Sequence, residues 1–487
     1  MVLRSAFYYA ARLRTKRPPL PALTIPRPWA ATGVALGLSA SLYLAALNTV
    51  HGDAEEDDSD PDSEPVPSSE NTAEPSLPPL NAGFTADISQ WPSPIRYLGD
   101  PPPDGIVRMY WFTHYDTRLR IMSRGHRALI SLLEGDFVNR ANIADVIQEN
   151  LWYNVENLFR WYQTDQTNPQ PVEFMQEMHP PPNSIVQTMK TSISLSDEYV
   201  LNQLVGRVFS TLSKRNAPEA IRATSSSCLI SALYEGDVGL LHVASLGNMR
   251  ALLGRPRTAE DGTVTYGVHV LSFDHSPDNP AEKSRIEGLH AGEDVFEDGT
   301  LFGRSYTRAL GDGKLKWSTH VQTRLHRDYL GAAPDPKVKT PPYVSAEPDV
   351  STIKIMPGDF LVLSSRWLAE CLTDEEVVGL VGIWLNKNQD THLHQPLDPV
   401  NPSDPPPGVI VSPDDLPVEL KEDKTVMYRR WNVPKRFINV DHNPSTHLAN
   451  NAMGGADLDL RRALLELAPS ESEGNTKALG IAVVVFK

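Results

Sequence analysis

The chain has 487 residues, 42 prolines, two cysteines and a formal net charge of −16 at pH 7. This acidic balance argues against a general nucleic-acid binder, which would normally present a basic face. Two cysteines, Cys228 and Cys371, exclude a disulfide framework and a cysteine zinc site. We expect both to be buried small apolar residues. The length allows one large domain or two to three ordinary ones.

The N-terminal region differs from the acidic average. No acidic residue precedes Asp53, whereas basic side chains lie among Leu, Ala, Ser and aromatic residues, so residues 1–28 resemble a mitochondrial presequence. Residues 29–47 are uncharged and predict a transmembrane helix, with a secretory apolar region or a buried helix as the alternative. An inner-membrane anchor would place the rest of the chain in the intermembrane space. Cleavage and complete import would place it in the matrix.

The remaining chain divides into a tether and a folded part. Residues 48–80 are acidic and rich in Pro and Ser, which predicts a disordered tether, and residues 81–487 are expected to fold. Apolar spacing predicts helices over 121–137, 143–162, 196–214, 280–289, 373–386 and parts of 445–467, and strands over 108–112, 227–234, 240–245, 249–253, 360–363 and 481–486. A Pro-rich surface insert is expected near 386–435. The pattern indicates a layered α+β domain.

Several motifs in this folded part carry a resemblance. Residues 361–370, LVLSSRWLAE, follow the turn at Pro357-Gly358 and resemble L-V-L-A-S-D-G-L-W-D of the metal-dependent Ser/Thr protein phosphatases, the PPM or type 2C family. Residues 243–251 resemble V-A-N-V-G-D-S-R-A, and residues 304–312 resemble the S-R-A-x-G-D element. The segments 290–293, 340–344 and 446–448 are most similar to the mitochondrial pyruvate dehydrogenase phosphatase branch. The resemblance implies a β-sandwich of two antiparallel sheets flanked by helix pairs.

The resemblance also implies a two-metal site, in which carboxylates hold Mg²⁺ or Mn²⁺ and a bridging water attacks phosphorus. Aligning the family's F-D-G-H motif with residues 112–115 puts Thr113 at the bridging aspartate and His114 beside it. A second metal-binding aspartate falls on Arg366, and the C-terminal acidic position falls on Leu479. Asp312 keeps its family residue. Loss of these carboxylates predicts that the domain has no metal cofactor.

These observations lead to three hypotheses. The first is a catalytically inactive family member, a pseudophosphatase, that acts in mitochondria as a binding or regulatory protein. Its protein partner would offer a phosphorylated or acidic segment to Arg304, Arg308 and Arg366. The second is an active phosphatase of the pyruvate dehydrogenase phosphatase type, which would need Mg²⁺ or Mn²⁺. The third is a structural subunit of a mitochondrial membrane assembly. None of them involves nucleic acid.

Overall fold

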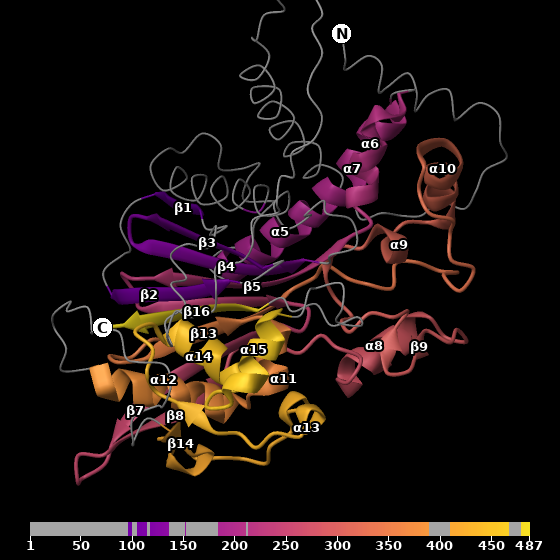
Figure 1. The fold of residues 1–487 in the computed structure, drawn as a ribbon. Coiled ribbons are helices and arrows are strands. Elements are labelled where there is room, and N and C mark those ends of the chain that lie inside the picture. The colour runs from indigo at the N-terminus through magenta and orange to yellow at the C-terminus, as the bar shows by residue number, and fades with distance from the viewer. Residues whose placement is uncertain are drawn as a thin grey trace, which may run out of the picture. The chain divides into compact units, whose positions relative to one another are not determined.

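The computed structural model describes residues 96–99, 105–113, 117–135, 151, 184–210, 213–388, 410–466 and 479–487. Within these residues, two β-sheets form the centre of the fold (Figure 1). Sheet A has the order β1-β3-β4-β5-β6-β12, with β11 pairing β5, and sheet B has the order β2-β16-β13-β7-β8. All pairs are antiparallel except β1 with β3, which is parallel. The α+β fold class is therefore confirmed.

The strand bounds follow the apolar runs of the sequence. Sheet A contains β1 (Arg96–Gly99), β3 (Thr117–Arg124), β4 (Arg127–Gly135), β5 (Ser226–Glu235), β6 (Leu240–Leu246), β11 (Leu310–Gly311) and β12 (Asp349–Lys354). Sheet B contains β2 (Ile106–Thr113), β7 (Arg250–Thr258), β8 (Val264–Val270), β13 (Phe360–Ser364) and β16 (Gly480–Phe486). The inner faces of the two sheets share one apolar core, to which Ile230 of β5 and Leu361 of β13 both belong. Burying these faces against each other is the dominant favourable term for such a layered fold.

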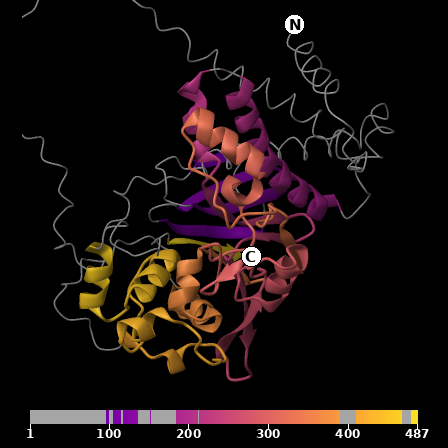
Figure 2. The ribbon, with the colours of Figure 1, turned by 90° about the vertical axis from the view of Figure 1, so that its right-hand side faces the viewer.

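Helices cover the outer faces of both sheets (Figures 1 and 2). On sheet A lie α5 (Ser184–Glu198), a π-helix (Tyr199–Gln203), α6 (Leu204–Ser210), a 3-10 turn (Lys214–Asn216) and α7 (Ala217–Arg222). On sheet B lie α11 (Arg366–Cys371), α12 (Asp374–Asn388), α13 (Met427–Trp431), α14 (Pro444–Ala452) and α15 (Leu458–Glu466). A second apolar core joins the outer face of sheet B to these helices, with Phe360 and Val378 among its fully buried members.

A smaller unit lies between β8 and β12 in the sequence. It contains α8 (Pro280–Leu289), β9 (Phe296–Glu297), β10 (Thr300–Leu301), α9 (Gly313–Lys316) and α10 (Thr319–Tyr329). It has its own apolar cluster around Ile286, Leu315 and Tyr343. Asn279 caps α8 by accepting a hydrogen bond from the Ala281 N–H at 3.0 Å, and Pro280 occupies the first turn. The cap and the proline set the start of α8, and the helix predicted over 280–289 is confirmed.

One predicted element is wrong. The segment 121–137 was expected to be a helix, but β3 and β4 form a hairpin there, with Gly125 at φ 56° in the turn. Strand β4 is buried on both faces, and its apolar residues therefore follow one another without alternation: Leu129, Ile130, Leu132 and Leu133. Such a continuous apolar run contains the i, i+3, i+4 spacing of a helix as well. Among the longer strands, β8 and β12 were also not predicted.

Several expectations concern residues outside the described ranges: the presequence-like segment 1–28, the span 29–47, the tether 48–80 and residues 389–409 of the insert. No helix in the described part of the chain has the length and apolarity that crossing a bilayer requires. The described part of the insert forms β14 (Ile410–Val411), which pairs with β15 (Phe437–Ile438), and a 3-10 turn (Pro413–Asp415). Its Leu416 and Met427 are buried in the core below sheet B.

Candidate functional site

The ends of four strands meet at one point of the sandwich. Thr117 of β3 lies directly opposite Glu134 of β4 in sheet A. The Thr117 hydroxyl donates a hydrogen bond to the carbonyl of Leu479 at 3.4 Å, just before β16 of sheet B. The Ser365 N–H donates to the Gly480 carbonyl at 2.9 Å, and the Gly480 N–H donates to the Ser365 hydroxyl at 3.0 Å. These bonds fix the end of sheet A against the ends of β13 and β16.

Arg366 is the cation at this point. It begins α11 directly after β13, and its backbone N–H donates to Glu134 Oε2 at 3.3 Å. Its guanidinium donates through Nε to Glu370 Oε1 at 2.7 Å, one helical turn away, and through Nη1 to the Ser305 carbonyl at 3.3 Å. The side chain is 34% exposed. Arg366 thus contacts sheet A, the loop around Ser305 and its own helix.

Cys228 of β5 lies directly opposite Glu134 of β4 in sheet A. Burial raises the pKa of the Cys228 thiol to about 12, and the negative charge of Glu134 adds to this rise. The hydrogen bond with Asn248, at 3.8 Å from the sulfur, and the charge of Arg366 act in the opposite direction. The thiol is therefore protonated at neutral pH and is not a nucleophile, because the thiolate is the reactive form.

The retained acidic position, Asp312, is committed to internal partners. Its side chain is fully buried and accepts bonds from Arg304 Nε at 2.9 Å and Arg304 Nη2 at 3.2 Å. The Tyr306 hydroxyl donates to the same carboxylate at 2.9 Å. Asp312 also has a left-handed backbone, φ 54°, at the start of α9. The Asp312 carboxylate thus stabilises its loop by accepting bonds from Arg304 and Tyr306, and both of its oxygens are engaged in these bonds.

The groups that the structure describes at the strand ends do not fit a pair of divalent cations. Mg²⁺ and Mn²⁺ prefer several anionic oxygen ligands. Here the strand ends offer the hydroxyls of Thr117 and Ser365, the apolar Leu479, the carboxylate of Glu134 and the guanidinium of Arg366. Across the described ranges, no three His, Cys, Asp or Glu side chains are grouped so that they could hold a metal ion.

The structure places the predicted site residues unequally. Arg366 and Leu479 lie at the convergence, whereas Thr113 lies one strand away, paired with Gly480 in sheet B. His114 is outside the described residues. The residue that the structure brings to the Arg366 backbone N–H is Glu134, which the sequence alignment did not single out. The sequence analysis missed Glu134 because it predicted a helix over 121–137, where the structure has the end of β4.

A sequence signal for Glu134 exists. The run Leu133-Glu134-Gly135 ends an apolar strand and is followed by Asp136, so it also fits the F-D-G-H pattern with glutamate in place of aspartate. Strand β4 also pairs with β5, which carries the Ser226-Ser227-Cys228 element of the same resemblance. Reading the hairpin correctly would have placed this glutamate and Thr117 at the site.

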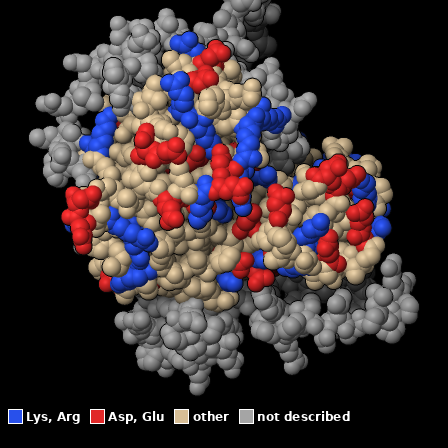
Figure 3. All heavy atoms as spheres, turned by 90° about the horizontal axis from the view of Figure 1, so that it is seen from below, with Lys and Arg blue, Asp and Glu red and all other residues tan. Residues whose placement is uncertain are grey.

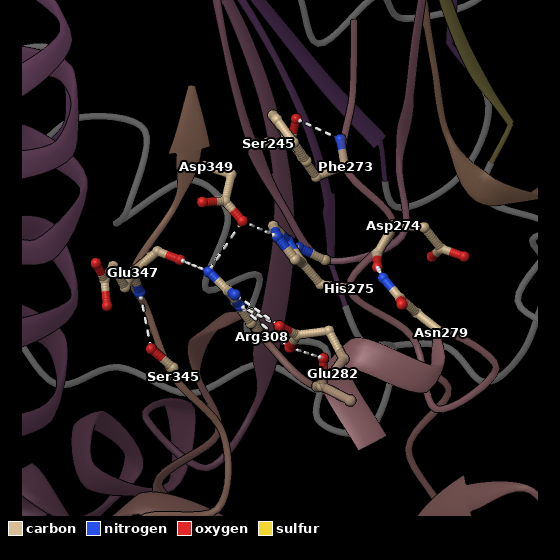
Figure 4. A network of polar contacts seen from close by, with 12 residues as sticks. Ser245, Phe273, Asp274, His275, Asn279, Glu282, Arg308, Ser345, Glu347 and Asp349 are labelled. Carbon is tan, nitrogen blue, oxygen red and sulfur yellow. Dashed lines mark hydrogen bonds and ion pairs between the residues drawn. The ribbon is translucent and has the colours of Figure 1, made fainter. Parts of the chain in front are cut away.

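Arg308 belongs to a separate network at the edge of sheet A (Figure 4). It donates to Glu282 Oε1 at 2.6 Å through Nη2, contacts Asp349 Oδ2 at 3.3 Å, and donates to the Glu347 carbonyl at 2.9 Å. His275 contacts the same Asp349 oxygen through Nε2 at 2.9 Å. With a side chain only 12% exposed, Arg308 is occupied by internal acceptors. Basic and acidic side chains are also interspersed on the face shown in Figure 3.

Comparison with known proteins finds sequence similarity to protein phosphatases over part of the chain. The sequence model described as protein phosphatase 2C matches residues 177–397. A protein phosphatase 2C homolog of Schizosaccharomyces pombe is 32% identical over 302 residues, which cover 60% of this chain and 60% of that protein. The mitochondrial [pyruvate dehydrogenase [acetyl-transferring]]-phosphatase 1 of Saccharomyces cerevisiae is 30% identical over 325 residues, 63% of this chain and 54% of that protein.

The match with these relatives is partial, since it spans between half and two thirds of their length. Among solved structures, a serine-threonine phosphatase 2C from Toxoplasma gondii is similar with a TM-score of 0.42 and 14% identity, covering 80% of this chain and 100% of that one. Together with the ordered motifs of the sequence, the family match and the relatives lead to one conclusion. The chain contains a protein phosphatase 2C domain, which the family model matches over residues 177–397.

Proposed function

We propose that this chain is a catalytically inactive member of the family, a pseudophosphatase that acts in mitochondria by binding a protein partner. The observation that carries the proposal is the position of Arg366. Its guanidinium lies at the strand ends where the family resemblance requires a metal-binding carboxylate, and Glu370 and Ser305 hold it there. A fixed positive charge repels a divalent cation at close range.

The mitochondrial part of the proposal has two supports. The pyruvate dehydrogenase phosphatases of Saccharomyces cerevisiae and Homo sapiens, 30% and 32% identical to this chain, are named as mitochondrial proteins. The basic, acid-free residues 1–28 and the apolar residues 29–47 are compatible with import and anchoring in the inner membrane. We propose that the folded part lies in the intermembrane space, or in the matrix if the N-terminal region is removed.

Of the three arginines considered for partner binding, two are engaged by buried carboxylates. Arg304 is held by Asp312 and Arg308 by Glu282, and both acceptors have nearly inaccessible side chains. Arg366 is the most exposed of the three, at 34% of its side chain. We therefore propose Arg366 as the contact for an acidic or phosphorylated segment of a partner, by charge-assisted hydrogen bonds.

Titration calorimetry of Mn²⁺ and Mg²⁺ into the 487-residue chain, with a phosphopeptide hydrolysis assay on the same sample, tests the proposal. The expected result is no binding heat and no turnover, while the yeast pyruvate dehydrogenase phosphatase serves as the positive control. Tight binding of two ions with turnover would establish instead an active phosphatase of that type, which the sequence similarity favours.

Partner binding needs its own experiment. Proteins that co-purify with the chain from mitochondria are compared for the unchanged chain, for Arg366→Glu and for Arg327→Glu. Arg327 lies on α10 with 69% of its side chain exposed, so Arg327→Glu makes the same charge change on another helix. A partner lost only with Arg366→Glu, at a temperature where circular dichroism shows that variant to be folded, supports the proposal. Equal capture by all three argues against Arg366 as the contact, and capture that resists high salt favours a structural subunit.

A further inference from the structure

We infer that the guanidinium of Arg366 is a built-in structural cation, which joins the start of α11 to the loop around Ser305 at the position where the family resemblance expects a metal-binding carboxylate. The inference rests on the proposed function, because it takes the groups at the strand ends as unsuited to divalent cations. It adds a role in folding stability that is separate from any partner. Its basis is the set of contacts made by this one residue.

The contacts of Arg366 join parts of the chain that lie far apart in sequence. Its backbone N–H reaches Glu134, 232 residues earlier, and its Nη1 reaches the carbonyl of Ser305, 61 residues earlier. The Ser305 carbonyl and hydroxyl also accept bonds from the Asn248 amide, at 2.9 and 3.3 Å. The backbone N–H of Arg366 therefore links α11 to sheet A, and its guanidinium links α11 to the loop around Ser305.

The charges around Arg366 require a cation. Glu370 pairs with its Nε and has a side chain only 20% exposed, and Glu134 lies at its backbone N–H. Cys228 is the register partner of Glu134 in sheet A, and the charges of Glu134 and Arg366 act on the pKa of its thiol in opposite directions. Removing the guanidinium takes the ion-pair partner from the partly buried Glu370 and a donor from the Ser305 carbonyl, and loss of one partner is the costly change for an ion pair. Arg suits this position because its planar fork reaches a carboxylate and a carbonyl at once.

The inference predicts an exchange of one cation for another. Arg366→Met should lower the midpoint temperature of unfolding, by at least about 3 °C for a domain of this size. Arg366→Asp places a third carboxylate beside Glu134 and Glu370, so it should lower that temperature further in EDTA. Millimolar Mn²⁺ should recover most of the loss in Arg366→Asp, because an added carboxylate supplies an oxygen ligand. The unchanged chain should show the same melting temperature with EDTA and with Mn²⁺.

Thermal unfolding of the 487-residue chain and its variants, followed by circular dichroism, gives the readout without any activity assay. Arg327→Asp is the matched control, since it makes the same charge change on an exposed part of α10. Arg366→Lys keeps the positive charge but loses the planar guanidinium, so its melting temperature should lie between those of the unchanged chain and Arg366→Met. The Arg366→Lys variant is measured in place of Arg366→Asp if Arg366→Asp does not fold.

The outcomes separate this inference from the proposed function. If Mn²⁺ raises the melting temperature of the unchanged chain, the proposed function fails and the inference fails with it. If the unchanged chain is indifferent to Mn²⁺ but Arg366→Met melts at the same temperature, the inference fails while the proposed function stands. A loss in Arg366→Met together with recovery of Arg366→Asp by Mn²⁺ supports both.

Discussion

Glu282 is the most heavily bonded carboxylate of the network in Figure 4, and its neutralisation should have a large, measurable effect. It accepts bonds from Thr307 at 2.6 Å, from Arg308 at 2.6 to 3.2 Å and from Arg285 at 2.7 to 3.1 Å. Its side chain is 6% exposed. We expect Glu282→Gln to lower the free energy of unfolding.

The size of the loss in Glu282→Gln depends on the contacts that the partners of Glu282 keep in the variant. Breaking a buried ion pair from one side costs about 3–5 kcal/mol. Arg308 keeps Asp349 and the Glu347 carbonyl, Arg285 is 30% exposed, and glutamine keeps one acceptor for Thr307. These compensations reduce the expected loss to about 2–3 kcal/mol. Glu287→Gln on the same helix is the control, because its pair with Lys283 spans 4.0 Å with both side chains half exposed, and it should cost less than about 0.5 kcal/mol.

Urea unfolding at several pH values checks both the size and the sign. Burial acts to raise the pKa of Glu282, but the hydrogen bonds from Arg308, Arg285 and Thr307 outweigh it and hold that pKa below its usual value. Its contribution is therefore fully present above the unfolded pKa of about 4.3 and is lost as the pH falls below it. The gap between the unchanged chain and Glu282→Gln should shrink in acid. A Glu282→Gln loss no larger than that of Glu287→Gln at pH 7 would refute the reasoning.

Three further predictions rest on single sites. Gly247→Ala should cost about 3 kcal/mol in urea unfolding, because φ is 99° and a Cβ would collide with Cys228, whereas Gly262→Ala, with φ 85° and open space, should cost about 1 kcal/mol. Cys228 should react with a thiol reagent at least about 100-fold faster in denaturant than in the folded protein, since burial raises its pKa to about 12; equal rates would contradict this. Asp359→Asn should cost about 1.5–3 kcal/mol by calorimetry, because its fully buried carboxylate accepts two bonds from Arg255, at 2.9 and 2.7 Å, and a stability equal to that of the unchanged chain would count against it.

The sequence predicted the elements whose signals are local. Strands β13 and β16 are short apolar runs with clear ends, and α8 has a cap and a proline at its start. The hairpin of β3 and β4 was not predicted, because burial on both faces of β4 removes the alternation that marks a strand.

The site was predicted only in part, for a related reason. Arg366 was found because it replaces an aspartate within a contiguous motif. Its acceptor Glu134 is 232 residues away, and the Arg308 contact with Glu282 spans 26 residues. Pairings of this kind depend on how strands are ordered in the two sheets, which no local spacing encodes.

The order of sheet B also has a consequence for how the protein is made. Strand β16 lies between β2 and β13, so it supplies hydrogen-bond partners to both neighbours. Until residues 480–486 have been synthesised, β2 and β13 each present an unpaired backbone edge, and the apolar residues of both cores remain accessible. A shortened chain that ends before Gly480 would keep these edges permanently. In a cell, we expect such a truncated chain to be bound by chaperones or degraded by proteases, rather than to persist as a less stable form of the protein.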